Sequence, residues 1–239
     1  MPSIVDDRGF NQGYKESRSV EVRTDRRCDY IIGKMDLQET TKILEIGCGT
    51  GRHSHMIAKK TGKYVLGTDI CKPFIETAQN RYSLQNLEYK TLDFNSREDV
   101  NAVLSGQTFD YVVGDGILHH LYYNMDNSLA SINKLLKPGG KAIFLEPNFY
   151  NPYCLLIFKI GFFRKLAKLE PSEMTFTSSF IKSKLEKAGF SRTDTEYRDF
   201  LVPGTPDFLI GPVVAVGNVL EKIPVIKMLA QSIFISAVK

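Results

Sequence analysis

The sequence predicts a doubly wound α/β fold, in which helices cover both faces of a largely parallel sheet. From Lys42 onward, short β-branched and apolar runs alternate with segments of helical spacing. Strands that alternate with helices of about ten residues form βαβ units, and such units build parallel sheets. The composition agrees, because 43% of the 239 residues are hydrophobic and 24% are charged, as in a globular domain with its own core.

The elements up to Leu145 follow the same alternation. The polar residues 1–40 include a predicted helix from about Val20 to Met35. The apolar runs predict strands at 42–46, 64–68, 87–91, 109–113 and 141–145. The segments between them predict helices at 52–60, 73–82, 97–104 and 125–136.

The alternation breaks after Pro147. Two stretches beyond it are predicted to be irregular, 148–175 and 199 to about 224, and both are interrupted by prolines. Between and after these stretches, the pattern predicts a helix at 180–188 and strands at 190–197 and 232–238. The irregular stretches flank the last strands, where a lid over a substrate can form.

Several classes of protein are excluded or disfavoured. The longest apolar stretch, 208–220, is interrupted by glycine and proline and is shorter than the roughly 18–20 residues of a membrane-spanning helix. No apolar segment follows the N-terminus, so we expect no secretory signal. The four cysteines lie far apart, which favours free thiols in a reducing cytoplasm over a zinc site or disulfides. The net charge of +4 does not by itself imply a nucleic-acid partner.

The strongest functional signal is the glycine-rich turn after the first strand. Gly47, Gly49 and Gly51 directly follow this strand, and Glu45 lies two residues before the first glycine. Such glycines let the backbone turn sharply and approach a ligand closely. Their G-x-G-x-G spacing differs from the G-x-G-x-x-G of dinucleotide-binding folds, which disfavours a nicotinamide oxidoreductase.

This turn resembles the first motif of class I S-adenosylmethionine-dependent methyltransferases, in particular the small-molecule enzymes of the type 11 group. Four further motifs follow in the family's order. They are Gly67 to Ile70 after the second strand, Leu92 to Phe94 after the third, 109–121, and 136–142. The resemblance implies a Rossmann-like sheet of seven strands with an antiparallel last strand, an N-terminal helical cap and lid insertions.

The resemblance also implies how the cofactor, S-adenosyl-L-methionine, is held. An aspartate such as Asp69 binds both ribose hydroxyls, because a carboxylate can accept two O–H bonds at once; Ile70 packs on the adenine, and Asp93 with Phe94 holds its amino group. The expected cofactor-binding residues are Glu45, Gly47, Cys48, Gly49, Gly51, Arg52, Asp69, Ile70, Asp93, Phe94, Asp115 and His120. Within this set Cys48 is a small filler rather than a nucleophile, and Arg52 either meets the methionine carboxylate or faces solvent. We expect no metal ion.

The candidates for the chemistry are His119, then Glu146, and then Tyr14 or Tyr30 of the N-terminal cap. The pKa of a histidine lies near working pH, so His119 could act as general base for a hydroxyl; a packing or substrate-contact role is the alternative. In the family pattern His120 lies beside the methionine end of the cofactor and His119 faces the substrate. Glu146, at the end of the fifth strand, is the second candidate. Positioning and desolvation can also support an in-line methyl transfer without any base.

The two insertions bear on the acceptor. Residues 153–169 mix apolar and aromatic side chains with cations, and the segment 151–192 carries a charge of +5 against −1 for the rest of the chain. An interfacial helix has this composition, so one interpretation is a peripheral membrane contact through 153–169 or an apolar acceptor pocket. The favoured interpretation is an ordinary lid helix, whose apolar side packs on the sheet and whose lysines are solvated. The predicted substrate contacts are Tyr14, Tyr30 and Tyr150.

We therefore expect a single domain, with a cap at 1–40, a cofactor-binding core at 41–147, and lid insertions at 148–180 and 199–228. The predicted function is methyl transfer from S-adenosylmethionine to oxygen or nitrogen of a small, hydrophobic or lipid-linked acceptor, in the cytoplasm or at a membrane surface. The Asn/Asp-Pro-Pro-Tyr/Phe signature of enzymes that methylate base amines is missing, because Asp115 and Gly116 stand there; we expect no nucleic-acid partner. The alternative is a module that binds the cofactor without turnover, as a sensor or docking protein.

Overall fold

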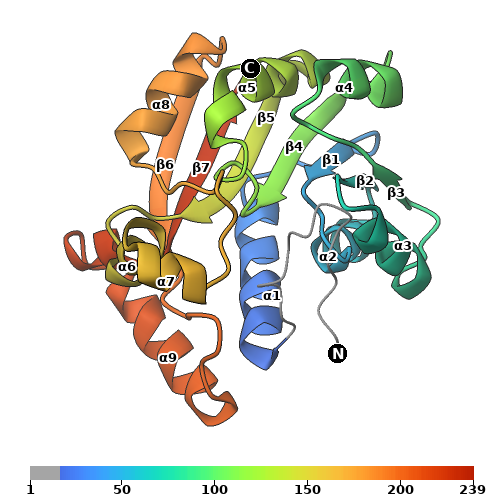
Figure 1. Cartoon of the computed structure of the whole chain (residues 1–239). Coiled ribbons are helices and arrows are strands. Elements are labelled where there is room, and N and C mark those ends of the chain that lie inside the picture. The colour runs from blue at the N-terminus through green and yellow to red at the C-terminus, as the bar shows by residue number, and fades with distance from the viewer. Residues whose placement is uncertain (1–16) are drawn as a thin grey trace.

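The computed structural model describes residues 17–239 and contains a seven-stranded sheet with helices on both sides (Figure 1). The strands are β1 (Lys42–Ile46), β2 (Tyr64–Asp69), β3 (Leu87–Thr91), β4 (Phe109–Asp115), β5 (Leu136–Pro147), β6 (Arg192–Arg198) and β7 (Ser232–Val238). The longer helices are α1 (Arg18–Ile32), α2 (Arg52–Thr61), α3 (Lys72–Arg81), α4 (Arg97–Leu104), α5 (Met125–Leu135), α6 (Pro152–Lys159), α7 (Gly161–Leu166), α8 (Ser178–Lys187) and α9 (Asp207–Leu220). Short 3-10 turns are η1 (Tyr122–Asn124) and η2 (Ile226–Leu229).

The sheet topology confirms the predicted fold class. The strand order is β3-β2-β1-β4-β5-β7-β6. The pairs among β1 to β5 are parallel, whereas β7 runs antiparallel to both β5 and β6. The order reverses between β1 and β4, and ligands of doubly wound sheets bind at the carboxyl ends of the strands beside such a switch point.

Neighbouring residues of the central strands supply two separate hydrophobic layers. Leu44 packs in a cluster with side chains of α4, α5 and α8, whereas the adjacent Ile43 packs in a second cluster with side chains of α1, α2 and α3. Successive residues of a strand point to opposite faces. Both faces of the sheet are therefore covered, which explains why the central strands are apolar runs rather than alternating ones.

The structure corrects three of the predicted elements. α1 ends at Ile32, because Gly33 closes it, and not at Met35. β5 begins five residues before Lys141, since Leu136 already pairs with Phe109 across an irregular register. The stretch predicted as irregular at 199–224 contains the 14-residue helix α9; its internal glycines and Pro212 hid the helical pattern, because these residues disfavour helix interiors.

The segment 153–169, which lies in a stretch predicted as irregular and has the composition of an interfacial helix, contains two short helices. α6 and α7 meet at Ile160, which has extended backbone angles. The end of α6 is set by this residue, whose backbone N–H still bonds to the carbonyl of Leu156. None of the helices within residues 17–239 is both long enough and apolar enough to span a bilayer.

Candidate active site

Two adjoining cavities lie at the carboxyl ends of the parallel strands. One has a volume of about 250 Å³ and is bordered by Asp69; we call it the Asp69 cavity. The other has a volume of about 350 Å³ and is bordered by His119; we call it the His119 cavity. The residues that line both are Gly47, Gly49, Asp115 and Gly116. The cavities therefore meet at the turns that follow β1 and β4.

The glycine turn borders both cavities with bare backbone. Gly47, Gly49 and Gly51 all have left-handed φ angles, of +69°, +53° and +83°, which side chains with a Cβ rarely adopt. A Cβ at Gly51 would lie 2.6 Å from the Cβ of Ala78 and 2.7 Å from the hydroxyl of Tyr89, whereas a Cβ at Gly49 would meet nothing within 4 Å. Gly51 is thus needed for packing, and Gly49 leaves room where a ligand can approach the backbone.

The Asp69 carboxylate is fixed by backbone donors at the end of β2. Its Oδ2 accepts the N–H of Gly49 at 2.9 Å and its Oδ1 accepts the N–H of Cys71 at 2.8 Å. Burial raises the pKa of Asp69, although these two hydrogen bonds oppose the shift. Each carboxylate oxygen can accept more than one hydrogen bond. Asp69 therefore retains the capacity to accept two hydroxyl groups, as a ribose requires.

Apolar side chains complete the Asp69 cavity. Ile70, Phe74, Leu92 and Phe94 line it, together with Asp93. The Oδ1 of Asp93 accepts the N–H of Asn95 at 2.8 Å and so holds the turn after β3 in place. A flat aromatic base fits a cavity that has apolar walls and a few fixed polar groups.

Glu45 holds the glycine turn and α2 together. Its carboxylate is buried and contacts Nδ1 of His53 at 2.7 Å and the hydroxyl of Ser54. Burial lowers the pKa of His53, but the charge of Glu45 and its hydrogen bond outweigh this effect and raise it. Glu45 borders the His119 cavity, yet its oxygens are already used to position the first turn of α2.

His119 lies between two carboxylates on the wall of the second cavity. Its Nδ1 is 2.8 Å from Oε2 of Glu146, and its Nε2 is 3.7 Å from Oε2 of Glu173. Burial alone lowers the pKa of His119, but hydrogen bonding and the negative charges of Glu146 and Glu173 outweigh burial and raise the pKa to about 9. The imidazole is therefore protonated at neutral pH in this arrangement.

Glu146 acts on His119 and on the turn that carries it. Its two oxygens accept four hydrogen bonds, from the N–H groups of Ile117, Leu118 and His119 and from the His119 ring. A carboxylate with four donors has little capacity left for a ligand. Glu146 is thus placed to orient the imidazole rather than to contact an acceptor itself.

His120 lines the Asp69 cavity, whereas its neighbour His119 lines the His119 cavity. Its Nδ1 is 3.9 Å from carboxylate oxygens of both Glu170 and Glu173. His119, His120 and Glu173 offer possible metal ligands that all lie within 4.8 Å of one another. Within this cluster, Nε2 of His119 already faces the carboxylate of Glu173.

Two arginines that the sequence reading missed also border the His119 cavity. Arg23 and Arg27 lie four residues apart on α1, hence on one face, and both line this cavity. Their Nε atoms lie 3.3 Å and 3.2 Å from Oδ2 of the buried Asp199, and Arg27 also pairs with Asp115. Burial lowers the pKa of Arg23 to about 10, so it stays charged at neutral pH. The four-residue spacing within the predicted cap helix was the signal that could have identified them.

The remaining candidates fall in different places. Arg52 borders the His119 cavity but pairs with Asp25 at 2.8 Å. Cys48 also borders it, and burial raises the pKa of its thiol well above the usual value, which keeps the thiol neutral and unsuited to act as a nucleophile.

The structure does not bring Tyr30 or Tyr150 to either cavity. The Tyr30 hydroxyl accepts a hydrogen bond from Arg26 at 2.7 Å instead. The Tyr150 ring packs edge-on against Phe149 and Tyr197. Tyr14 lies outside the described residues.

Comparisons with known proteins match this chain to methyltransferases. A family model described as a methyltransferase domain matches residues 44–142. Lovastatin diketide synthase mokB of Monascus pilosus is 33% identical over 170 residues. The match covers 66% of this chain but only 6% of that protein. The chain thus spans less than a tenth of the length of this curated relative.

Solved structures share the fold. A methyltransferase from Archaeoglobus fulgidus that depends on S-adenosylmethionine has a TM-score of 0.62 at 19% identity, over 92% of this chain and 93% of that chain. The CurJ carbon methyltransferase has a TM-score of 0.61 at 21% identity, over 95% of this chain and 56% of that chain.

Residues 44–142 therefore form a methyltransferase domain, which is an enzymatic domain, and its fold and glycine turn are those of class I S-adenosylmethionine-dependent methyltransferases. Its cofactor is S-adenosyl-L-methionine. The residues present fit this molecule, because the backbone at Gly49 is open and the fixed carboxylate of Asp69 can accept two hydroxyl groups.

Proposed function

We propose that the enzyme methylates oxygen or nitrogen of a small acceptor with an apolar part, and that His119 takes up the proton lost by the acceptor atom. The observation that carries this proposal is the place of His119. His119 is buried, its Nδ1 is hydrogen-bonded to Glu146, and it borders the His119 cavity. A base fixed in this way is oriented toward whatever occupies the His119 cavity.

The lining residues of the two cavities suit different ligands, the cofactor in one and the acceptor in the other. The Asp69 cavity suits the adenosine part of the cofactor, and the region bordered by Gly47, Gly49 and Asp115 joins it to the acceptor side. When bound, the cofactor supplies a methyl group on a positively charged sulfur. In the His119 cavity, Ile157 and Phe158 contribute apolar lining, and the Phe158 ring packs edge-on against the His119 ring.

The protein's own residues handle the proton. A carboxylate can only accept, so Glu146 fixes a proton on Nδ1 of His119 and leaves Nε2 as the atom that exchanges protons with the cavity. Nε2 must first lose its proton, because the pKa of His119 is raised to about 9. It can then accept the proton of the acceptor as the new bond to the methyl group forms, and Glu146 stabilises the resulting imidazolium.

The test is formation of S-adenosylhomocysteine with a panel of amphipathic alcohols and amines, each compared with the same head group lacking its apolar tail. We expect turnover with at least one tailed acceptor and at least about a tenfold loss of kcat/KM without the tail, since each buried methylene contributes about 0.8 kcal/mol. Tight cofactor binding without turnover on any acceptor would instead favour the module that binds the cofactor without catalysis.

A second candidate is methylation of an acidic carbon. It is favoured by the likeness to lovastatin diketide synthase mokB and to the CurJ carbon methyltransferase. A carbon between two carbonyl groups also loses a proton to a base, so His119 would serve in the same way. Assays with β-ketoacyl thioesters, with the position of the new methyl group determined by NMR, distinguish the two candidates: a methyl group on carbon would replace the oxygen or nitrogen proposal.

A further inference from the structure

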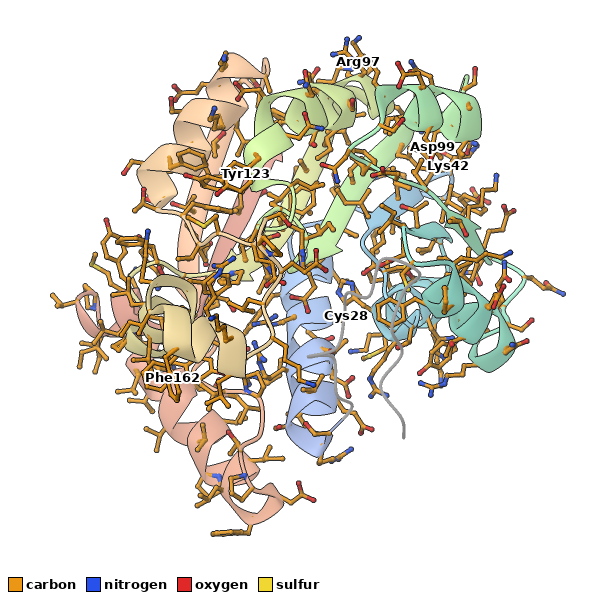
Figure 2. The ribbon with its side chains drawn as sticks, viewed as in Figure 1. Cys28, Lys42, Arg97, Asp99, Tyr123 and Phe162 are labelled. Atoms are coloured by element: carbon orange, nitrogen blue, oxygen red, sulfur yellow. The ribbon has the colours of Figure 1, made fainter. Side chains whose placement is uncertain are left out.

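Exposed apolar side chains gather on two segments of the chain. Residues 150–166 and 208–229 hold fourteen of the fifteen exposed large hydrophobic side chains in the described part of the chain, and the exception is Tyr123. Phe208 is 78% exposed and Phe162 is 70% exposed. Figure 2 shows Phe162 on α7 at the lower left of the view, well apart from Tyr123 above it. A concentration of this kind indicates an interaction site, whereas scattered single residues do not.

The helix α9 is the clearest case. It is almost entirely apolar, yet only Ile210 and Gly217 of its 14 residues are buried. Phe208, Val216 and Val219 are all more than half exposed. An apolar helix is normally buried in a core or in a membrane, so this helix lacks a partner for most of its surface.

The two segments are fastened to each other. Asn151, which caps the start of α6, donates a hydrogen bond to the carbonyl of Leu229 at 2.7 Å. The side-chain amide of Asn148 bonds the carbonyls of Met228 and Ala230 at 2.8 Å and 2.7 Å. In Figure 1, α6, α7 and α9 lie together at one end of the molecule. We call the surface formed by these two segments, residues 150–166 and 208–229, the docking face.

Cations accompany the apolar side chains. Lys159, Lys165 and Lys222 are exposed, and no acidic residue occurs between 150 and 169. The carboxylate of Glu221 is buried and pairs with arginines. Lysines set among exposed apolar residues are typical of helices at a membrane surface, whereas lysine is depleted in interfaces between proteins.

We infer that the docking face binds the surface of an anionic lipid bilayer, with its apolar side chains in the headgroup region and its lysines on lipid phosphates. α6 connects this face to the active site, because Ile157 and Phe158 line the His119 cavity while Leu156 and Ile160 are exposed. Docking therefore brings one wall of the His119 cavity to the lipid surface. Binding does not depend on the proposed methyl transfer and is measured without cofactor or acceptor.

The experiment is flotation of the full chain with vesicles of equal parts phosphatidylglycerol and phosphatidylcholine, and with phosphatidylcholine alone. The test variant is Phe162→Asp with Phe208→Asp, and a charge variant is Lys159→Glu with Lys165→Glu. Tyr123→Asp is the matched control, since this aromatic residue is 73% exposed outside the docking face. Circular dichroism and titration with S-adenosylhomocysteine verify that each variant is folded.

We expect the wild type to bind the anionic vesicles at least about tenfold more tightly than the neutral ones at low salt. Both double variants should lose at least about tenfold in this binding, and Tyr123→Asp should not change it. The inference is overturned if the wild type does not float with the anionic vesicles. It is equally overturned if Tyr123→Asp loses as much vesicle binding as the double variant Phe162→Asp with Phe208→Asp. It is also overturned if light scattering shows a lipid-free dimer that the aspartate variant dissociates, because the face would then bind a second copy.

Discussion

Glu146 and His119 form one hydrogen-bonded unit: Oε2 of Glu146 is 2.8 Å from the imidazole Nδ1 and 3.2 Å from the backbone nitrogen of the same histidine. The carboxylate comes from the end of β5, and the histidine from the turn after β4. Because β4 and β5 are neighbouring parallel strands, the sheet itself fixes the distance between them. The imidazole therefore keeps one orientation without help from a ligand.

The first prediction concerns this unit. His119→Asn removes the base and should lower kcat by about a hundredfold or more, with little change in the dissociation constant of the cofactor. Glu146→Gln should lower kcat less, because the imidazole remains but loses its fixed tautomer. Steady-state kinetics with the acceptor found in the panel measures both.

The control for that prediction is His55→Asn, since His55 stacks on Tyr82 and borders neither cavity. This variant should keep its activity. Equal activity of His119→Asn and the wild type would remove His119 from the chemistry.

The second prediction concerns pH. The neutral form of His119 is the base, and its pKa is raised to about 9, so kcat should rise with pH and level off above about 9. Glu173→Gln removes one of the two charges that raise this pKa. The rise should therefore move to lower pH, and activity at neutral pH should become a larger fraction of the plateau.

A pH profile of kcat for wild type, Glu173→Gln and the exposed control Glu88→Gln tests the sign. The control should follow the wild type. A rise that stays in place in Glu173→Gln would contradict the role given to this carboxylate.

The third prediction separates the two functions of the glycine turn. Gly51→Ala places a methyl group against Ala78 and Tyr89 and should lower the free energy of unfolding by about 3 kcal/mol, through overpacking and the positive φ. Gly49→Ala meets open space and should lower it by only about 1 kcal/mol, but should weaken cofactor binding by about tenfold or more. Urea denaturation and calorimetric titration of both variants measure the difference; equal losses of stability would contradict it.

The fourth prediction concerns metal ions. His119, His120 and Glu173 lie close enough to hold a metal, but both ring nitrogens of His119 already face carboxylates. Treatment with EDTA should therefore leave kcat unchanged. Loss of activity that one added divalent cation restores would show instead that this cluster is a metal site.

Much of the fold follows from local sequence patterns. The glycine turn, the aspartate after β2 and the alternation of apolar runs with helical segments each depend on residues close together in the chain, so they are visible without a structure. The helix α9 was not visible, because Pro212 and its glycines resemble a loop pattern. Intrinsic propensity alone therefore does not predict this helix.

The site was only partly predictable for a related reason. Arg23 contacts Asp199 across 176 positions of the chain, and Glu173 reaches His119 from the insertion before α8. Neither partner follows a spacing rule, since such contacts depend on how the lid and the cap fold over the sheet. The raised pKa of His119 could not be inferred without them.

The proposed methyl transfer depends on cofactor binding around Asp69. Calorimetric titration of S-adenosylmethionine and S-adenosylhomocysteine into the protein tests this binding most directly. Asp69→Ala should abolish measurable binding of both while the protein remains folded, because the ribose loses its fixed carboxylate. Asp194→Ala, on the exposed part of β6, should bind as the wild type does. Undiminished binding by Asp69→Ala would contradict the assignment of the cofactor site.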